Sequence, residues 1–271
     1  MKKRVVIAMS TDKNFIFPTL VCITSIMKNK SEQVSVLIYI MFSKNVTDKE
    51  KSEFLLLKNK YRNLEFVFLS IKEDDDSFYT GFIKSKASLY RLKLASLLSK
   101  ENKCLYLDGD TIVSSDLFEL FSKDINNYYI AAVRDLKLSK KAIIRPKLLK
   151  KVYFNTGVML VNLSKIRKDN LEKKFHNLLM NNNKEKKLYF VDQDIINIAC
   201  ENKILPLHLK YNYMTHLLRI KVLSKIIYSK KNWDEAKKKP VITHYTFIQP
   251  WQKNALKSFY KKWWSYAKIV R

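Results

Sequence analysis

The chain alternates between short apolar runs and longer amphipathic segments over most of its length. Apolar runs that are too short for helices are typical of strands buried on both faces of a sheet. They predict strands at residues 5–9, 34–40, 64–69, 104–107, 128–133, 158–161 and 241–243. Strands that alternate with helices in this way indicate an α/β fold with a mostly parallel central sheet.

The segments between these runs carry helix signals. Pro18 suits the first turn of a helix, and Thr47 with Glu50 forms a capping box that opens another. The inward side chains of that second helix should be Phe54, Leu55 and Leu57. Further helices are predicted at residues 87–98, 164–180 and 195–200, with an acidic loop at 72–78 and a basic loop containing a short helix at 136–152.

Composition narrows the class of protein. The chain has 271 residues, of which 47% are apolar, and no Pro/Gly/Ser-rich linker or internal repeat divides it, so one domain over residues 1–251 is expected. Its three cysteines, Cys22, Cys104 and Cys200, lack CxxC spacing and lie in apolar surroundings. They indicate buried thiols in a reducing compartment, neither a disulfide framework nor a zinc site.

The N-terminus has basic residues before an apolar run, as a signal peptide would. That run is too short for a signal peptide and is followed by polar Ser10, Thr11 and Asp12, so we expect a protein that is not secreted. No run approaches the roughly 18 apolar residues of a membrane-spanning helix.

The net charge of +27 indicates an anionic partner, which could be nucleic acid, an acidic membrane surface or a phosphorylated substrate. The excess lysines could equally do no more than solvate the surface. Residues 252–271 form a basic segment with interspersed aromatic residues and no carboxylate. Such a tail suits the surface of an anionic membrane, although a helix packed on the domain with its lysines in water is the alternative.

The main candidate for chemistry is Asp108-Gly109-Asp110, which directly follows the apolar run at 104–107. Ligands of open α/β sheets lie beyond the carboxyl ends of the strands, and residues i and i+2 of an extended segment point the same way. The two carboxylates can therefore converge on Mg²⁺ or Mn²⁺, which prefer oxygen ligands. Gly109 would allow a close approach to a ligand or a positive φ. A solvated turn is the alternative for an Asp-Gly pair.

Other polar residues lie at the ends of predicted elements. Asp12 and Asn14 follow the first strand and could bind a base and ribose, or merely form a turn. Arg91 lies among leucines and needs a partner, either a bound anion or the two aspartates. His244 ends an apolar strand, so its imidazole could complete the metal site, although a lone histidine is usually structural.

Four further residues lie at element ends, where polar side chains converge on a cleft. They are Asp135, Asn155, Asp192 and Gln193.

Taken in order, these residues resemble the motifs of glycosyltransferase family 8 over nearly the whole chain. The resemblance rests on the Asp12/Asn14 signature, the Arg91 helix and DxD at 108–110. It continues with Asp135, FNxGV at 154–158, DQD at 192–194 and HY…PW at 244–251. The tail is similar to that of lipopolysaccharide galactosyl- and glucosyltransferases.

The resemblance implies a GT-A fold, a UDP-glucose or UDP-galactose donor, Mn²⁺ (or Mg²⁺) and transfer with retention of configuration. It implies that Asp108, Asp110 and His244 hold the metal, and that Asp12, Asn14, Arg91, Asp108 and Gly109 contact the donor. Asp135, Asn155, Asp192 and Gln193 would orient the sugar. The acceptor would be a surface glycan such as lipopolysaccharide, built at the inner face of the cytoplasmic membrane. The acceptor, the linkage, the oligomeric state and the choice between a carboxylate nucleophile and front-face attack stay open.

One motif departs from the family pattern, which is roughly HxxGxxKPW. Phe247 lies near the position of its glycine, Gln249 replaces its lysine, and the segment is one residue shorter. Because a diphosphate carries more charge than one divalent ion neutralises, we expect another lysine, foremost Lys13, to compensate.

Two other classes of function compete with this interpretation. A nucleic-acid-binding protein would explain the charge, but the chain has no concentrated recognition motif, and converging acids would repel phosphates. No nucleic-acid partner is therefore expected. An inactive family member acting as a partner subunit would explain the missing lysine.

Overall fold

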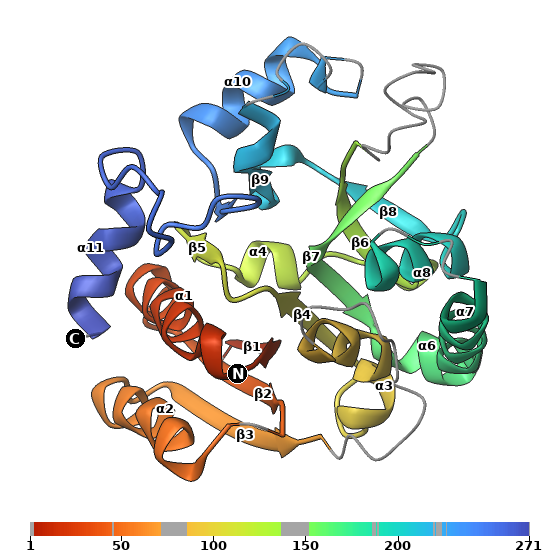
Figure 1. Ribbon diagram of the computed structural model, residues 1–271, viewed down its shortest axis with the longest axis horizontal. Coiled ribbons are helices and arrows are strands. Elements are labelled where there is room, and N and C mark those ends of the chain that lie inside the picture. The colour runs from red at the N-terminus through yellow and green to blue at the C-terminus, as the bar shows by residue number, and fades with distance from the viewer. Residues whose placement is uncertain are drawn as a thin grey trace.

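The structure is a computed structural model that describes residues 3–44, 46–71, 86–136, 152–185, 188, 190–218, 220, 224–225 and 227–270. The core is a seven-stranded sheet in the order β3-β2-β1-β4-β7-β6-β8, visible at the centre of the ribbon (Figure 1). Its strands are β1 (Lys3–Thr11), β2 (Val34–Phe42), β3 (Leu64–Ser70), β4 (Lys103–Leu107), β6 (Ile130–Arg134), β7 (Phe154–Asn162) and β8 (Ile204–Leu207). Only β7 runs antiparallel to its neighbours, so the predicted mostly parallel α/β sheet is confirmed.

Helices cover both faces of this sheet because its strands are apolar on both sides. One face is covered by α1 (Ile16–Asn29), which follows β1 along the chain, and by α2 (Asp48–Lys60), which lies between β2 and β3 in the chain. The other face is covered by a 3₁₀ helix η3 (Lys86–Lys93), α3 (Leu94–Leu97), α6 (Leu163–Lys168), α7 (Leu171–Glu185) and α8 (Val191–Ala199). Alternate side chains of β1 enter the two cores: Val5 and Ile7 pack toward α1, and Val6 and Ala8 pack toward η3.

A second, three-stranded sheet in the order β5-β10-β9 lies beyond the carboxyl end of β4. It consists of β5 (Thr111–Val113), β9 (Tyr213–Met214) and β10 (Ile242–His244). His244 pairs with Thr111 in this sheet, and the Tyr245 amide donates to the Asp110 carbonyl over 2.9 Å. This sheet therefore brings the end of the chain back to the two aspartates. The short α4 (Phe118–Phe121) and α10 (Lys230–Lys238) lie outside both sheets.

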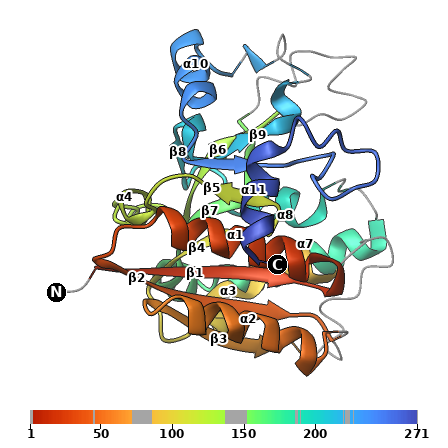
Figure 2. The ribbon, with the colours of Figure 1, turned by 90° about the vertical axis from the view of Figure 1, so that its left-hand side faces the viewer.

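The C-terminal helix α11 (Lys261–Val270) packs beside α1, as both ribbon views show (Figures 1 and 2). Trp263 is fully buried and Tyr260 is 6% exposed, in a cluster with Val21 of α1 and Tyr245 after β10. Part of the tail thus belongs to the core, whereas Leu256 and Phe259 before α11 are 75% and 60% exposed.

Three expectations about local structure were wrong. Residues 87–98 do not form one α-helix but η3 followed by α3, because the contacts of Arg91 with neighbouring elements override helix propensity there. The helix expected at 164–180 is divided into α6 and α7 at Asn170, whose φ of 49° lies in the left-handed region that asparagine tolerates. Leu55 is 45% exposed, although Phe54 and Leu57 are buried as predicted.

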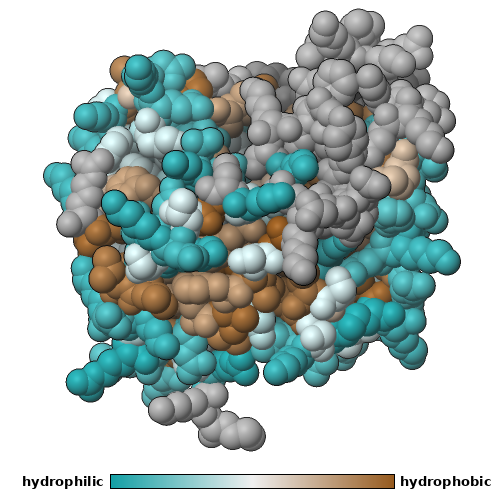
Figure 3. All heavy atoms as spheres, turned by 60° about the horizontal axis from the view of Figure 1, so that its bottom comes forward, coloured by the Kyte–Doolittle hydropathy of each residue, from teal (hydrophilic) through white to brown (hydrophobic). Residues whose placement is uncertain are grey.

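The loop predicted at 72–78 lies outside the described residues, as does most of the one at 136–152. Seen from the side of β3 and α2, the surface is mostly hydrophilic around a band of apolar residues (Figure 3). Within the described part of the chain, no helix combines the length and the apolarity needed to cross a bilayer.

Candidate active site

Asp108, Asp110 and His244 form a cluster at the carboxyl end of β4. One potential ligand atom of each residue lies within 4.8 Å of those of the other two. His244 Nε2 is 3.1 Å from Asp110 Oδ1 and 3.9 Å from Asp108 Oδ2. The aspartates do not converge along an extended strand, as the sequence suggested, but in the turn between β4 and β5, which the Thr111 hydroxyl closes by donating to the Asp108 carbonyl. The predicted convergence is present, produced by a different local geometry.

A hydrogen bond from the far side fixes the orientation of the His244 ring. The Asn212 amide NH₂ donates to Asn155 Oδ1 over 2.8 Å, which leaves Asn212 Oδ1 as the acceptor 3.1 Å from His244 Nδ1. Nδ1 therefore carries the proton, and the lone pair of a neutral ring is on Nε2, which faces the carboxylates. This is how a metal-binding histidine is usually held.

Electrostatics at the cluster favour a cation. Burial alone would lower the pKa of His244, but the Asp110 and Asp108 carboxylates outweigh burial and raise it. Burial also raises the pKa of Asp108, although the Arg91 guanidinium opposes that shift. Two carboxylates facing one imidazole stabilise positive charge between them, whether it comes from a proton or a metal ion.

Two observations fit a divalent metal at this position. Asp110 Oδ1 is buried, and its nearest potential donor is His244 Nε2 at 3.1 Å. When that nitrogen carries no proton, the oxygen has no hydrogen bond within the described residues, which is costly unless a cation satisfies it. A Cβ on Gly157 would lie 2.4 Å from both Asp108 Oδ2 and His244 Cε1, so only glycine leaves room for this arrangement. The donor set of two carboxylates and one imidazole suits Mn²⁺ or Mg²⁺, and the residues present fit the expected ion.

Arg91 connects the cluster to the opposite wall of the site. Its guanidinium is 2.7 Å from Asp108 Oδ1 and 3.2 Å from Asp192 Oδ2, and it also donates to the Thr156 carbonyl over 2.9 Å. It lies 4.6 Å from the centroid of the Tyr106 ring. Of the two aspartates considered as partners for this buried cation, Asp108 is confirmed, whereas the second carboxylate is Asp192 and not Asp110.

A cavity of about 470 Å³ opens beside the metal cluster. It is lined by every residue predicted to orient the sugar: Asp135, Asn155, Asp192 and Gln193. The Asn155 amide donates to Asp135 Oδ2 over 3.2 Å, and Gln193 Oε1 accepts the Thr156 amide proton. The four residues come from β6, β7 and α8 or their ends, so only the fold brings them together.

His216, Thr246 and Phe247 also line this cavity and were not among the predicted site residues. His216 Nε2 is 3.1 Å from Asp135 Oδ1, and its Nδ1 is 2.8 Å from the Thr246 hydroxyl. A continuous series of polar contacts therefore runs from His244 to His216 through Asn212, Asn155 and Asp135. Asn212 and His216 belong to no sequence pattern that would have identified them, because their roles depend on contacts across the fold.

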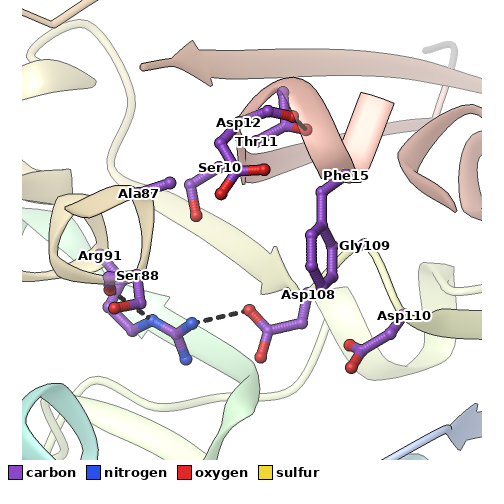
Figure 4. Close-up of a pocket in the computed structure, with 10 residues that line it drawn as sticks. All are labelled: Ser10, Thr11, Asp12, Phe15, Ala87, Ser88, Arg91, Asp108, Gly109 and Asp110. Atoms are coloured by element: carbon purple, nitrogen blue, oxygen red, sulfur yellow. Dashed lines mark hydrogen bonds and ion pairs between the residues drawn. The ribbon is translucent and has the colours of Figure 1, made fainter. Parts of the chain in front are cut away.

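A smaller cavity of about 160 Å³ shares Arg91 with the large one (Figure 4). Asp12, Gly109 and Phe15 line it. Asp12 Oδ1 accepts the Asn14 amide proton and so caps a short 3₁₀ helix η1 (Lys13–Phe15). The Asn14 side chain is exposed and does not line this cavity. Nucleotide binding by Asp12 and Asn14 stays a prediction.

The structure explains why a glycine occupies position 109. Its φ is not positive, so the alternative based on φ is wrong. A Cβ there would lie 2.6 Å from the Thr19 hydroxyl on α1. The close approach that glycine permits at this position is therefore to α1.

The two residues named in the expectation about the missing lysine, Lys13 and Gln249, line neither of the two cavities. Lys13 Nζ is 3.8 Å from Glu50 Oε1 at the start of α2. Gln249 exchanges hydrogen bonds with Gln252. Compensation of the missing lysine by Lys13 stays a prediction.

Residues 6–255 match the family model described as Glycosyl transferase family 8. The chain belongs to glycosyl transferase family 8. This confirms the family resemblance drawn from the motifs. A Haemophilus influenzae relative is 31% identical over 83% of this chain. The lipopolysaccharide 1,2-glucosyltransferase of Escherichia coli is 31% identical over 74% of it.

Among solved structures, galactosyltransferase LgtC in complex with donor and acceptor sugar analogues superposes with a TM-score of 0.80. The two chains are 20% identical, with 98% of this chain and 96% of that one covered. This likeness confirms the GT-A type of fold. The chain spans 66% of the Haemophilus influenzae relative and 60% of the Escherichia coli transferase.

Proposed function

We propose that the protein is a metal-dependent, retaining hexosyltransferase that moves glucose or galactose from a UDP-sugar to a surface glycan such as lipopolysaccharide. The observation that carries the proposal is the cluster of Asp108, Asp110 and His244 on the wall of a large polar cavity. Membership of the family and the names of its relatives support the reaction class. They also favour activity over an inactive subunit.

In this proposal each of the predicted site residues has a defined role. Asp108, Asp110 and His244 would hold Mn²⁺ (or Mg²⁺), which when bound would offset part of the diphosphate charge and stabilise charge on departing UDP. Asp12 and Asn14 contact uracil and ribose. Arg91 holds Asp108 and Asp192 in place, and its remaining surface faces the donor.

The sugar is oriented by Asp135, Asn155, Asp192 and Gln193. The bond between the anomeric carbon and the UDP oxygen breaks, and a bond to the acceptor oxygen forms. The hydroxyl proton of the acceptor leaves to a UDP oxygen in front-face attack. In the double-displacement alternative, a carboxylate first displaces UDP from the anomeric carbon and forms a glycosyl ester. The acceptor oxygen then displaces that carboxylate, and its proton leaves to the freed carboxylate or to a UDP phosphate.

The test is hydrolysis of UDP-glucose and UDP-galactose by the purified full chain, with Mn²⁺ and with Mn²⁺ removed by a chelator. UDP release that requires the metal and prefers one sugar is expected. If neither sugar is hydrolysed faster than in buffer under any metal condition, the inactive-subunit alternative replaces this proposal.

We also propose that the segment before α11 docks on the inner face of an anionic cytoplasmic membrane. Leu256 and Phe259 are exposed apolar side chains, and exposed lysines such as Lys253 and Lys257 surround them. Each such lysine contributes about 1 kcal/mol at an anionic surface. The double variant Leu256→Ser with Phe259→Ser keeps the buried Trp263 and should sediment less with phosphatidylglycerol vesicles.

The matched control for this test is Leu56→Ser on α2, a leucine that is 68% exposed. Sedimentation of the double variant equal to that of this control would remove the membrane proposal.

A further inference from the structure

Phe247 has a backbone conformation that phenylalanine rarely adopts. Its φ is 74°, and the other non-glycine residues with positive φ in the described chain are Asn170 and Asn202. Asparagine tolerates the left-handed region, whereas other L-residues pay roughly 1–2 kcal/mol there. The ring is 68% exposed, so little burial offsets that cost. Strain that persists without a packing gain points to a role in binding or catalysis.

Neighbouring contacts hold Phe247 in this conformation. The Thr215 hydroxyl donates to the Thr246 carbonyl over 3.1 Å, and the His216 amide donates to the Thr246 hydroxyl over 3.1 Å. The Phe247 ring centroid lies 5.8 Å from that of His216, with the planes inclined by 44°. Both side chains line the 470 Å³ cavity. The ring is thus positioned at the cavity wall with accessible surface left over.

The charges around the cavity limit what that surface can contact. Its described lining holds four carboxylates, those of Asp108, Asp110, Asp135 and Asp192, against one guanidinium. The charge of the Mn²⁺ proposed at this site would be offset by the donor diphosphate. Arg91 already pairs with two of them. An anionic acceptor, such as a uronic acid or a phosphorylated sugar, would be repelled by this lining and by the donor diphosphate.

An uncharged pyranose fits both features. One face of such a ring consists of C–H groups, which pack on an aromatic ring through buried area and weak C–H···π contacts. Its hydroxyl edge can hydrogen-bond to polar groups such as Asp135 and His216 beside the ring. Few precisely placed polar groups next to an apolar wall are typical of small-molecule sites.

We propose that Phe247 is the platform for the acceptor, binding the C–H face of an uncharged pyranose and thereby deciding which acceptor is used. This inference rests on the proposed hexosyltransferase function. The exposed ring could instead enter a membrane together with Leu256 and Phe259, but its contact with His216 at the cavity wall favours the sugar.

The experiment uses the full chain with Mn²⁺ and the UDP-sugar that it hydrolyses. Methyl β-glycosides of glucose, galactose and N-acetylglucosamine serve as acceptor probes, and acceleration of UDP release over hydrolysis reports transfer. The probe with the largest acceleration is then titrated against wild type, Phe247→Ala, Phe247→Tyr and the control Leu56→Ala on α2. Leu56 is 68% exposed, as Phe247 is, and does not line the cavity.

Phe247→Ala should raise the acceptor KM about tenfold, and by a larger factor than it changes the KM of the UDP-sugar in hydrolysis. Phe247→Tyr should restore most of the acceptor affinity, because the ring is kept, and Leu56→Ala should match wild type. Magnetisation transfer from aromatic protons of the protein to C–H protons of the probe should be weaker in Phe247→Ala.

Three results would overturn the inference while leaving the proposed function standing. The first is metal-dependent hydrolysis that no probe accelerates. The second is an acceptor KM of Phe247→Ala equal to that of Leu56→Ala. The third is loss of vesicle binding as the sole effect of Phe247→Ala. Absence of hydrolysis in wild type would instead remove the proposed function, and the inference with it.

Discussion

The two ends of the large cavity are constructed differently. At the metal end, Asp110 and His244 are buried, and Asn212 and Asn155 hold the imidazole in one orientation. At the other end, Phe247 presents an exposed ring on a backbone with positive φ. The first end is buried and suited to a cation, whereas the second offers exposed apolar surface. In the proposed function, the first end would serve the reaction and the second the choice of acceptor.

The strongest challenge to the metal end is Asp110→Asn, which keeps the size of the side chain but removes its charge. Loss of metal-dependent UDP binding by at least about 100-fold is expected, since loss of outer-shell partners alone typically costs about 10- to 100-fold. Calorimetric titration of UDP in the presence of Mn²⁺ measures it. Asp234→Asn on the exposed face of α10 is the control, and equal affinities of the two variants would contradict the metal assignment.

Gly157→Ala tests whether the metal end depends on its geometry as well as its charges. The added Cβ would lie 2.4 Å from Asp108 Oδ2 and from His244 Cε1, so both groups must move. We expect Mn²⁺ affinity to fall roughly 10- to 100-fold, measured by titration of the metal with UDP present. The far-ultraviolet circular dichroism and cooperative unfolding of the variant distinguish a displaced site from a lost fold. Unchanged metal affinity would mean that the site is more adaptable than its packing indicates.

The Phe247 end is tested by comparing two substitutions at one position. Phe247 has a φ of 74°, and glycine alone relieves the left-handed strain at such an angle. The free energy of unfolding of Phe247→Gly should therefore be larger than that of Phe247→Ala, by up to about 1 kcal/mol. Chemical denaturation of both variants gives the difference. The same pair at Lys253, where φ is not positive, should show the opposite order. If Phe247→Ala also proves more stable than Phe247→Gly, Phe247 carries no strain.

The smallest effect is expected from Gln249→Lys. An added ammonium should tighten UDP binding by about 1 kcal/mol or less, since a partly exposed charge contributes little. Gln249 bonds to Gln252 and does not line the cavity, which favours the lower part of that range. UDP affinity is measured by calorimetry for Gln249→Lys and for Lys13→Ala. The Lys13→Ala variant should bind UDP more weakly if Lys13 supplies the second positive charge. Weaker binding by Gln249→Lys would contradict the expectation.

The order of strands and helices was predictable from the sequence because each buried strand needs an apolar run of its own. The runs ending at Met9 and Leu107 indicated strands that lie beside each other in the sheet. Asp108, Asp110 and His244 could be proposed as ligands because strand ends carry sites in α/β folds. The missed strands β5, β8 and β9 are only two to four residues long.

The pairing of elements far apart in sequence was decided by the tertiary structure alone. Asn212 and His216 have no local signal, and their hydrogen bonds to His244 and Asp135 exist only once β9 and β10 pair. Long-range contacts also affect η3, where Arg91 pairs with Asp108 and Asp192 and the backbone forms a 3₁₀ helix in place of the expected α-helix. Local sequence determines which segments can be strands or helices through burial and propensity. Which polar atoms meet depends on long-range packing, whose energy no local pattern contains.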